Sequence, residues 1–171
     1  MVLEDTVKII NLLAEKAVAA LKNSSNPFLV AERLNGLGSV IIPHLEKLLT
    51  ETEDTETKIL SALVLLQLNS KIGVSVLLDA IIQDEEYSGL IAVNLAKKGV
   101  KEAIQPIIKR LKICELKQID LIVNLLEALG QLNGKLTQDL YQHLTAINTP
   151  WQIRTLTETM IKEGIDFSVV S

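Results

Sequence analysis

Apolar residues recur every three or four positions along most of the chain, which is the spacing of an amphipathic helix. No long run of β-branched residues alternates with polar ones, as a half-buried strand would require. We therefore expect an all-α protein without strands.

Four segments repeat the same apolar pattern. They begin at Arg33, Val64, Asn94 and Ala128, so their starts lie 31, 30 and 34 residues apart. A period of about 30 residues with two apolar helical stretches is typical of a helical solenoid, in which each helix pair covers the next.

Each repeat is expected to hold two helices joined by a short turn. The first helices of the pairs are expected at 27–37, 54–69, 85–98, 115–132 and 150–163, and the second helices at 40–50, 72–82, 101–112 and 136–147. A further amphipathic helix at 3–22 has the apolar stripe Leu3, Val7, Ile10, Ala14, Ala17 and Leu21. We expect this helix to cover the open end of the first repeat, as terminal caps do in solenoids.

These elements predict one domain over 1–171, a right-handed α-solenoid of about four to five helix pairs. Its expected parts are a cap helix and break at 1–26, repeats at 27–50, 54–82, 85–112 and 115–147, and a C-terminal helix and tail at 150–171. The expected core is Leu34, Leu37, Ile41, Leu45, Leu48, Leu65, Leu68, Leu77, Leu78, Ile81, Ile91, Leu95, Ile104, Ile107, Leu111, Leu125, Leu129, Leu132, Leu140 and Leu144. Trp151 is expected to be buried against the helix at 136–147.

Glycines mark the expected helix ends. Gly38, Gly99, Gly134 and Gly164 each follow the first helix of a pair, where a left-handed residue is useful. Gly89 instead falls inside the expected helix 85–98, where glycine costs about 1 kcal/mol relative to alanine. We interpret Gly89 as a close contact between helices; a kink is the alternative.

One segment carries a family pattern. Between Asn94 and Leu111 the matching positions are Ala96, Gly99, Glu102, Ala103, Ile104 and Leu111. This segment resembles the short consensus of HEAT repeats, and its short period resembles the variant in phycobilisome-lyase-like proteins. The usual Asp-Pro of the HEAT turn is missing from every unit. The resemblance is specific for a solenoid fold and weak for function.

Composition excludes several classes of function. A formal net charge of −4 gives no general attraction to nucleic acid or anionic membranes. Aromatic residues make up only 3%, so the seven basic residues within 97–117 have no stacking platform beside them and are interpreted as a solvated patch. No apolar run approaches the roughly 20 residues of a membrane span, and one cysteine allows no internal disulfide. We expect a cytoplasmic protein that does not enter a membrane.

The sequence also lacks any residue pattern typical of catalysis or of a metal site. The candidate ligands are His44, His143 and Cys114, fewer and more scattered than a zinc site requires. Neither histidine is followed by glutamate, unlike the His-Glu pairs of HEAT hydroxylases that resemble deoxyhypusine hydroxylase. No histidine lies near Cys114 in sequence to act as its base, so this cysteine is interpreted as a small apolar residue under a turn. We expect no metal, no cofactor and no catalytic residue.

The second helices of the pairs have an outer side that does not pack. Helical geometry places there His44, Lys47, Asp79, Lys109, Arg110, Gln142 and His143. In a solenoid these residues would form one stripe of mixed charge along the concave surface, suited to another protein. We therefore expect a monomeric, non-enzymatic binding module: an adaptor, a chaperone-like factor or an immunity-type inhibitor. Two alternatives are a phycobilin lyase-like, chromophore-handling subunit, implied by the resemblance alone, and a HEAT-like nucleic-acid-binding protein.

Overall fold

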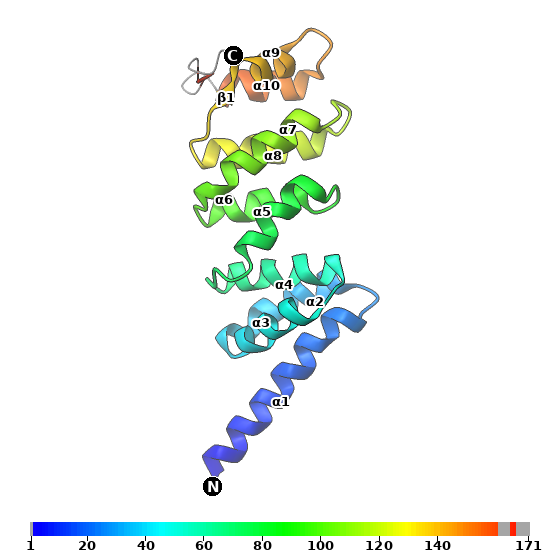
Figure 1. Ribbon diagram of the computed structural model, residues 1–171, viewed down its shortest axis with the longest axis vertical. Coiled ribbons are helices and arrows are strands. Elements are labelled where there is room, and N and C mark those ends of the chain that lie inside the picture. The colour runs from blue at the N-terminus through cyan, green and yellow to red at the C-terminus, as the bar shows by residue number, and fades with distance from the viewer. Residues whose placement is uncertain (1, 161–164, 167–171) are drawn as a thin grey trace. The chain divides into compact units, whose positions relative to one another are not determined.

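The structure is a computed structural model that describes residues 2–160 and 165–166, and it confirms the all-helical fold (Figure 1). The helices are α1 (Val2–Asn23), α2 (Pro27–Leu34), α3 (Ile42–Glu51), α4 (Thr55–Gln67), α5 (Val74–Gln83), α6 (Ser88–Lys97), α7 (Ile104–Ile113), α8 (Ile119–Gln131), α9 (Gln138–Thr145) and α10 (Trp151–Met160). Two 3-10 helices, η1 (Asn35–Ile41) and η2 (Lys101–Ala103), lead into α3 and α7. The helices lie where the apolar pattern predicted, with shifts of a few residues at their ends.

The expectation of a strand-free chain is wrong at one place. Leu136–Thr137 (β1) pairs in parallel with Ile165–Asp166 (β2). Thr137 is also the residue before α9, and such a position takes an extended backbone. This places the β-branched Thr137 in a conformation that suits a strand. The last residues expected in the helix at 150–163, and Gly164, lie outside the described residues.

Short polar side chains fix the starts of two helices. The Asn26 side chain accepts a hydrogen bond from the Leu29 backbone N–H at 3.1 Å, and Pro27 supplies a preset first helical residue to α2. Asp54 accepts a hydrogen bond from the Thr57 backbone N–H at 2.8 Å at the start of α4. Hydrogen bonding with Thr57 also lowers the pKa of the Asp54 carboxyl.

Four left-handed residues end the first helices of the pairs at the spacing of the sequence repeat. They are Gly38 (φ 68°), Asn69 (φ 64°), Gly99 (φ 68°) and Asn133 (φ 56°). The expectation at Gly134 is therefore wrong, because Asn133 takes the left-handed conformation one residue earlier. Asparagine tolerates this conformation better than other residues with a side chain.

The last three of these turns share one hydrogen-bond pattern. The residue after the left-handed one donates its N–H at 2.9 to 3.0 Å to a carbonyl five residues earlier, at Leu65, Leu95 or Leu129. The left-handed residue donates to the carbonyl three residues earlier, as a Schellman motif requires. Each turn thus closes its own helix end locally.

The chain divides into two compact units, Met1–Leu77 and Leu78–Ser171, with the division inside α5. In the first unit α2, η1, α3 and α4 pack with α1, and in the second α8 contacts α6, α7 and α10. Gly89 lies at the contact between α6 and α8, where an added Cβ would come within 3.1 Å of the Asn124 side chain. The interpretation of Gly89 as a close helix contact is confirmed.

Most of the residues expected to be buried are buried, but two are exposed. Leu37 is 48% exposed and Trp151 is 65% exposed. Leu37 belongs to η1 instead of α2, and the tighter winding of a 3-10 helix changes the side to which it points. Trp151 begins α10, whose packed side is occupied by Ile153. Four expected core residues are half-buried: Leu48, Leu68, Leu78 and Ile104.

Only the second half of α1 packs against the first unit. Ala14, Val18 and Leu21 are buried, whereas residues 4–13 are all exposed. Figure 1 shows this first half extending beyond α2, α3 and α4. The expected cap is therefore wrong at Val7 and Ile10, and the side chain of Leu3 lies outside the described part of α1.

Candidate protein-interaction surface

Two of the seven predicted surface residues lie on α3 in the first unit. Lys47 is exposed and His44 is half-buried, on the side of α3 away from the buried Leu45 and Leu49. Lys47 Nζ lies 4.0 Å from a carboxylate oxygen of Glu51, one turn further along α3. Such an exposed pair contributes little to stability, and the binding role of His44 and Lys47 stays a prediction.

The second unit holds the other five predicted residues. Asp79 on α5, Lys109 on α7, and Gln142 and His143 on α9 are exposed, as expected. The same helices bury apolar side chains in between, namely Ile81, Ile107, Leu111, Leu140 and Leu144. Each helix therefore separates an apolar packed side from a polar outer side.

An ion pair joins the outer sides of α7 and α9. Lys112 Nζ lies 3.4 Å from a carboxylate oxygen of Asp139. Lys112 follows Lys109 by one turn on α7, and His143 follows Asp139 by one turn on α9. The ion pair brings the last turn of α7 close to the first turn of α9. We call Lys109, Lys112, Asp139, Gln142 and His143 the α7–α9 surface.

Asp139 is held in its charged form by its neighbours. The neighbouring Thr137 side chain is the main cause that lowers the pKa of the Asp139 carboxyl, and the Lys112 ammonium acts in the same direction. Sequence reasoning missed both Lys112 and Asp139. The available signal was their placement one helical turn from Lys109 and His143.

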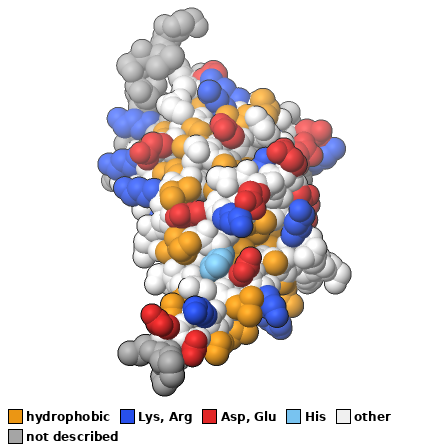
Figure 2. Space-filling model, turned by 60° about the horizontal axis from the view of Figure 1, so that its bottom comes forward, with side chains coloured by type: hydrophobic (Ala, Val, Ile, Leu, Met, Phe, Trp, Pro, Cys, Tyr) orange, Lys and Arg blue, Asp and Glu red, His pale blue; other side chains and the backbone are white. Residues whose placement is uncertain are grey.

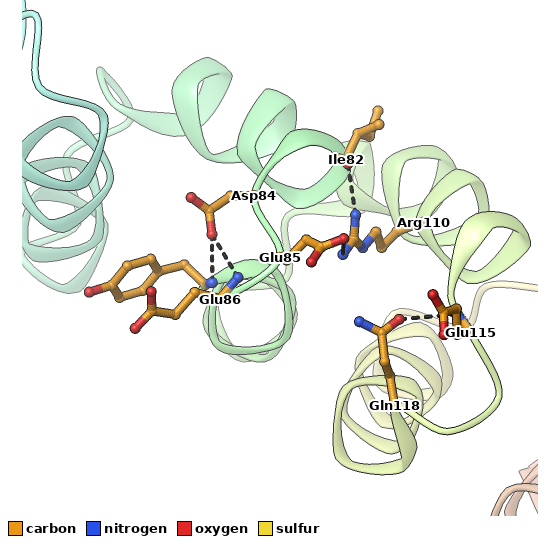
Figure 3. Close-up of polar contacts among 8 residues, drawn as sticks. Ile82, Asp84, Glu85, Glu86, Arg110, Glu115 and Gln118 are labelled. Atoms are coloured by element: carbon orange, nitrogen blue, oxygen red, sulfur yellow. Dashed lines mark hydrogen bonds and ion pairs between the residues drawn. The ribbon is translucent and has the colours of Figure 1, made fainter.

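The expectation that Arg110 faces solvent is wrong. Its side chain is 4% exposed, and Nη1 donates a hydrogen bond to the Ile82 carbonyl oxygen at 3.1 Å (Figure 3). Nη2 lies 3.9 Å from a carboxylate oxygen of Glu85. Arg110 thus reaches the C-terminal end of α5, where carbonyl groups lack helical partners and the helix dipole favours a cation. It holds α7 against α5 and leaves Lys109 beside it as the exposed cation.

The loop after α5 is organised by its acidic residues. Asp84 accepts hydrogen bonds from the backbone N–H groups of Glu86 at 3.0 Å and Tyr87 at 2.8 Å (Figure 3). The Glu115 N–H similarly donates to the Gln118 side chain at 3.0 Å before α8. These carboxylate and amide groups fix the backbone just before α6 and α8, which is a structural role.

Cys114 is buried where α7 ends, as the sequence suggested. Burial raises the pKa of the Cys114 thiol, and the nearby Arg110 charge opposes that rise. A thiol with a raised pKa is mostly protonated at neutral pH and is a poor nucleophile. Within the described residues, no group of three or more His, Cys, Asp or Glu side chains could hold a metal ion.

No protein-family model, curated protein or solved structure matches this chain. In the part of the chain that the structure describes, no helix is both long and apolar enough to cross a membrane.

Proposed function

We propose that this chain is a HEAT-like, right-handed α-solenoid that binds another protein without catalysis, through the α7–α9 surface. The recurring left-handed turns support the repeat, because they return at the period of the sequence segments. The successive contacts of α6 with α8, and of α8 with α10, agree with the stacking of like helices.

The ion pair between Lys112 and Asp139 is the observation that carries the binding proposal. It joins an exposed cation of α7 to an exposed anion of α9, and Lys109 and His143 lie exposed one helical turn away on the same two helices. Such a surface matches a protein that presents acidic groups to Lys109 and a basic or neutral group near Asp139. A surface for nucleic acid would be uniformly basic and would offer aromatic rings for stacking.

Affinity capture with a matched pair of variants tests this proposal. The chain is tagged and used to retain proteins from its native lysate after nuclease treatment, followed by quantitative mass spectrometry. Lys109→Glu reverses one charge on the α7–α9 surface, and Lys135→Glu makes the same change at an exposed position after α8. Both are expected to keep the wild-type circular dichroism, because both side chains are exposed.

The expected result is a retained protein whose binding weakens about tenfold with Lys109→Glu and stays unchanged with Lys135→Glu. Equal retention by both variants would move the binding site off the α7–α9 surface. Retention of nucleic acid alone, when nuclease is omitted, would contradict a protein-binding function.

A further inference from the structure

The first half of α1 exposes an unusual amount of apolar surface. The exposed fractions are 55% for Val7, 58% for Ile9, 44% for Ile10, 51% for Leu12 and 61% for Leu13. Figure 2 shows hydrophobic side chains among charged ones at the lower end of the view. Ile9, Leu12 and Leu13 share one side of the helix, at spacings of three and four residues from Ile9, and exposed apolar patches mark interaction sites.

Four exposed residues form a stripe along one side of this helix. They are Asp5, Ile9, Leu12 and Lys16, at successive spacings of four, three and four residues. Eleven residues are close to three full helical turns, so Asp5 and Lys16 lie on the same side. Ala14 and Val18 each lie two residues from Lys16, which places the buried contact with the first unit on the opposite side. The stripe therefore faces away from the rest of that unit.

The order of residues in the stripe is self-complementary. An acid stands at one end, a base at the other, and two aliphatic side chains lie between them. When a second α1 is laid antiparallel, Asp5 meets Lys16 and Ile9 meets Leu12 in both halves of the pair. In a parallel pair, like charges would instead meet at each end. A two-fold contact of this kind is the usual form of a homodimer interface.

A membrane surface fits the same helix less well. Glu4, Asp5 and Glu15 balance the three lysines of α1, whereas helices that lie on membranes carry an excess of Lys and Arg on the polar side. The balanced charge therefore gives α1 no attraction to anionic lipid.

We propose that two copies of this chain associate through antiparallel pairing of the Asp5–Lys16 stripe of α1. The contact spans about three helical turns, so its area is below the roughly 1,200 Å² of a standard interface. The dimer is accordingly weak and forms as the protein concentration rises.

Sedimentation velocity of the whole chain between about 1 and 500 μM tests the pairing. The wild type is expected to shift from monomer to dimer across this range. Asp5→Lys should weaken the dimer about fivefold to tenfold, because symmetry applies the repulsion twice. The double variant Asp5→Lys with Lys16→Asp should restore the wild-type affinity, since it reverses both partners of each ion pair.

Two further variants distinguish the proposed pairing of α1 from nonspecific association through exposed apolar side chains. Ile9→Gln should weaken the dimer at least about tenfold, whereas Ile147→Gln, at a 93% exposed site in the second unit, should not. Circular dichroism checks that each variant keeps its helices. A wild type that stays monomeric at every concentration overturns the proposal. A double variant as weak as Asp5→Lys also overturns it, as does binding to phosphatidylcholine–phosphatidylglycerol vesicles without dimerisation.

Discussion

Replacing Arg110 should separate the contribution of its charge from that of its apolar stem. Arg110→Met keeps a chain of similar length but removes the guanidinium, whereas Arg110→Ala removes both. The guanidinium donates one hydrogen bond to the Ile82 carbonyl and lies 3.9 Å from Glu85, but among the described residues its Nε has no hydrogen-bond partner. The charged group is therefore only partly satisfied.

The magnitudes follow from these contacts. A hydrogen bond from a charged donor stabilises by about 1.5–3 kcal/mol, and an unsatisfied buried donor costs about 1–3 kcal/mol. The Glu85 contact contributes at most about 1 kcal/mol, because that side chain is 80% exposed. These effects nearly cancel, so Arg110→Met should cost about 1 kcal/mol. Arg110→Ala also leaves a cavity where the stem packed and should cost about 3 kcal/mol.

Urea unfolding followed by circular dichroism measures both free energies, with Lys109→Met as the control on the exposed neighbour. The control should change the free energy of unfolding by less than about 0.5 kcal/mol. If Arg110→Met lowers the free energy of unfolding as much as Arg110→Ala does, the hydrogen bond to Ile82 dominates. The unsatisfied Nε would then cost less free energy than the value of about 1–3 kcal/mol given above. A near-zero cost for both variants would show that the contact between α5 and α7 does not depend on Arg110.

Three further predictions concern single positions. Hydrogen bonding with Thr57 lowers the pKa of Asp54 in the folded state, so the charged cap stabilises at neutral pH, and this contribution is lost as pH falls from the ordinary value of 3.8 through the lower folded value. Asp54→Ala should therefore cost about 1 kcal/mol in urea unfolding at pH 7, and a cost that is unchanged at pH 2 would contradict this role. Gly99→Ala should cost about 1 kcal/mol because φ is 68° there, whereas Gly36→Ala, in open space without a positive φ, should be neutral in the same assay. Trp151 should show solvent-like fluorescence that acrylamide quenches readily, since it is 65% exposed, and a blue-shifted spectrum would show burial instead.

The period of apolar residues was enough to predict the helix pairs, because a helix that is buried on one side has an apolar residue every three or four positions. The same period could not say which of two adjacent residues, Asn133 or Gly134, turns left-handed, since both types tolerate that conformation. It also could not reveal the short pairing at Leu136, which depends on a segment far away in sequence.

The surface residues show where helical spacing reaches its limit. Lys109 and Arg110 are neighbours that both fall near the expected outer side, and only the position of the α5 end decides that Arg110 turns inward. The first half of α1 shows a second limit. Its apolar pattern predicted burial of Val7 and Ile10, but both side chains are exposed, because the spacing of apolar residues does not show how far along a helix its packing partner extends.

The shared Schellman turns also bear on how the chain acquires its structure. The turns after Leu68, Lys98 and Leu132 each close through hydrogen bonds to residues at most five positions away. Chains dominated by such local contacts lose little loop entropy before their first favourable contacts form, and they fold quickly. Helix ends closed in this way can form at several points along the chain, so folding can begin in either unit.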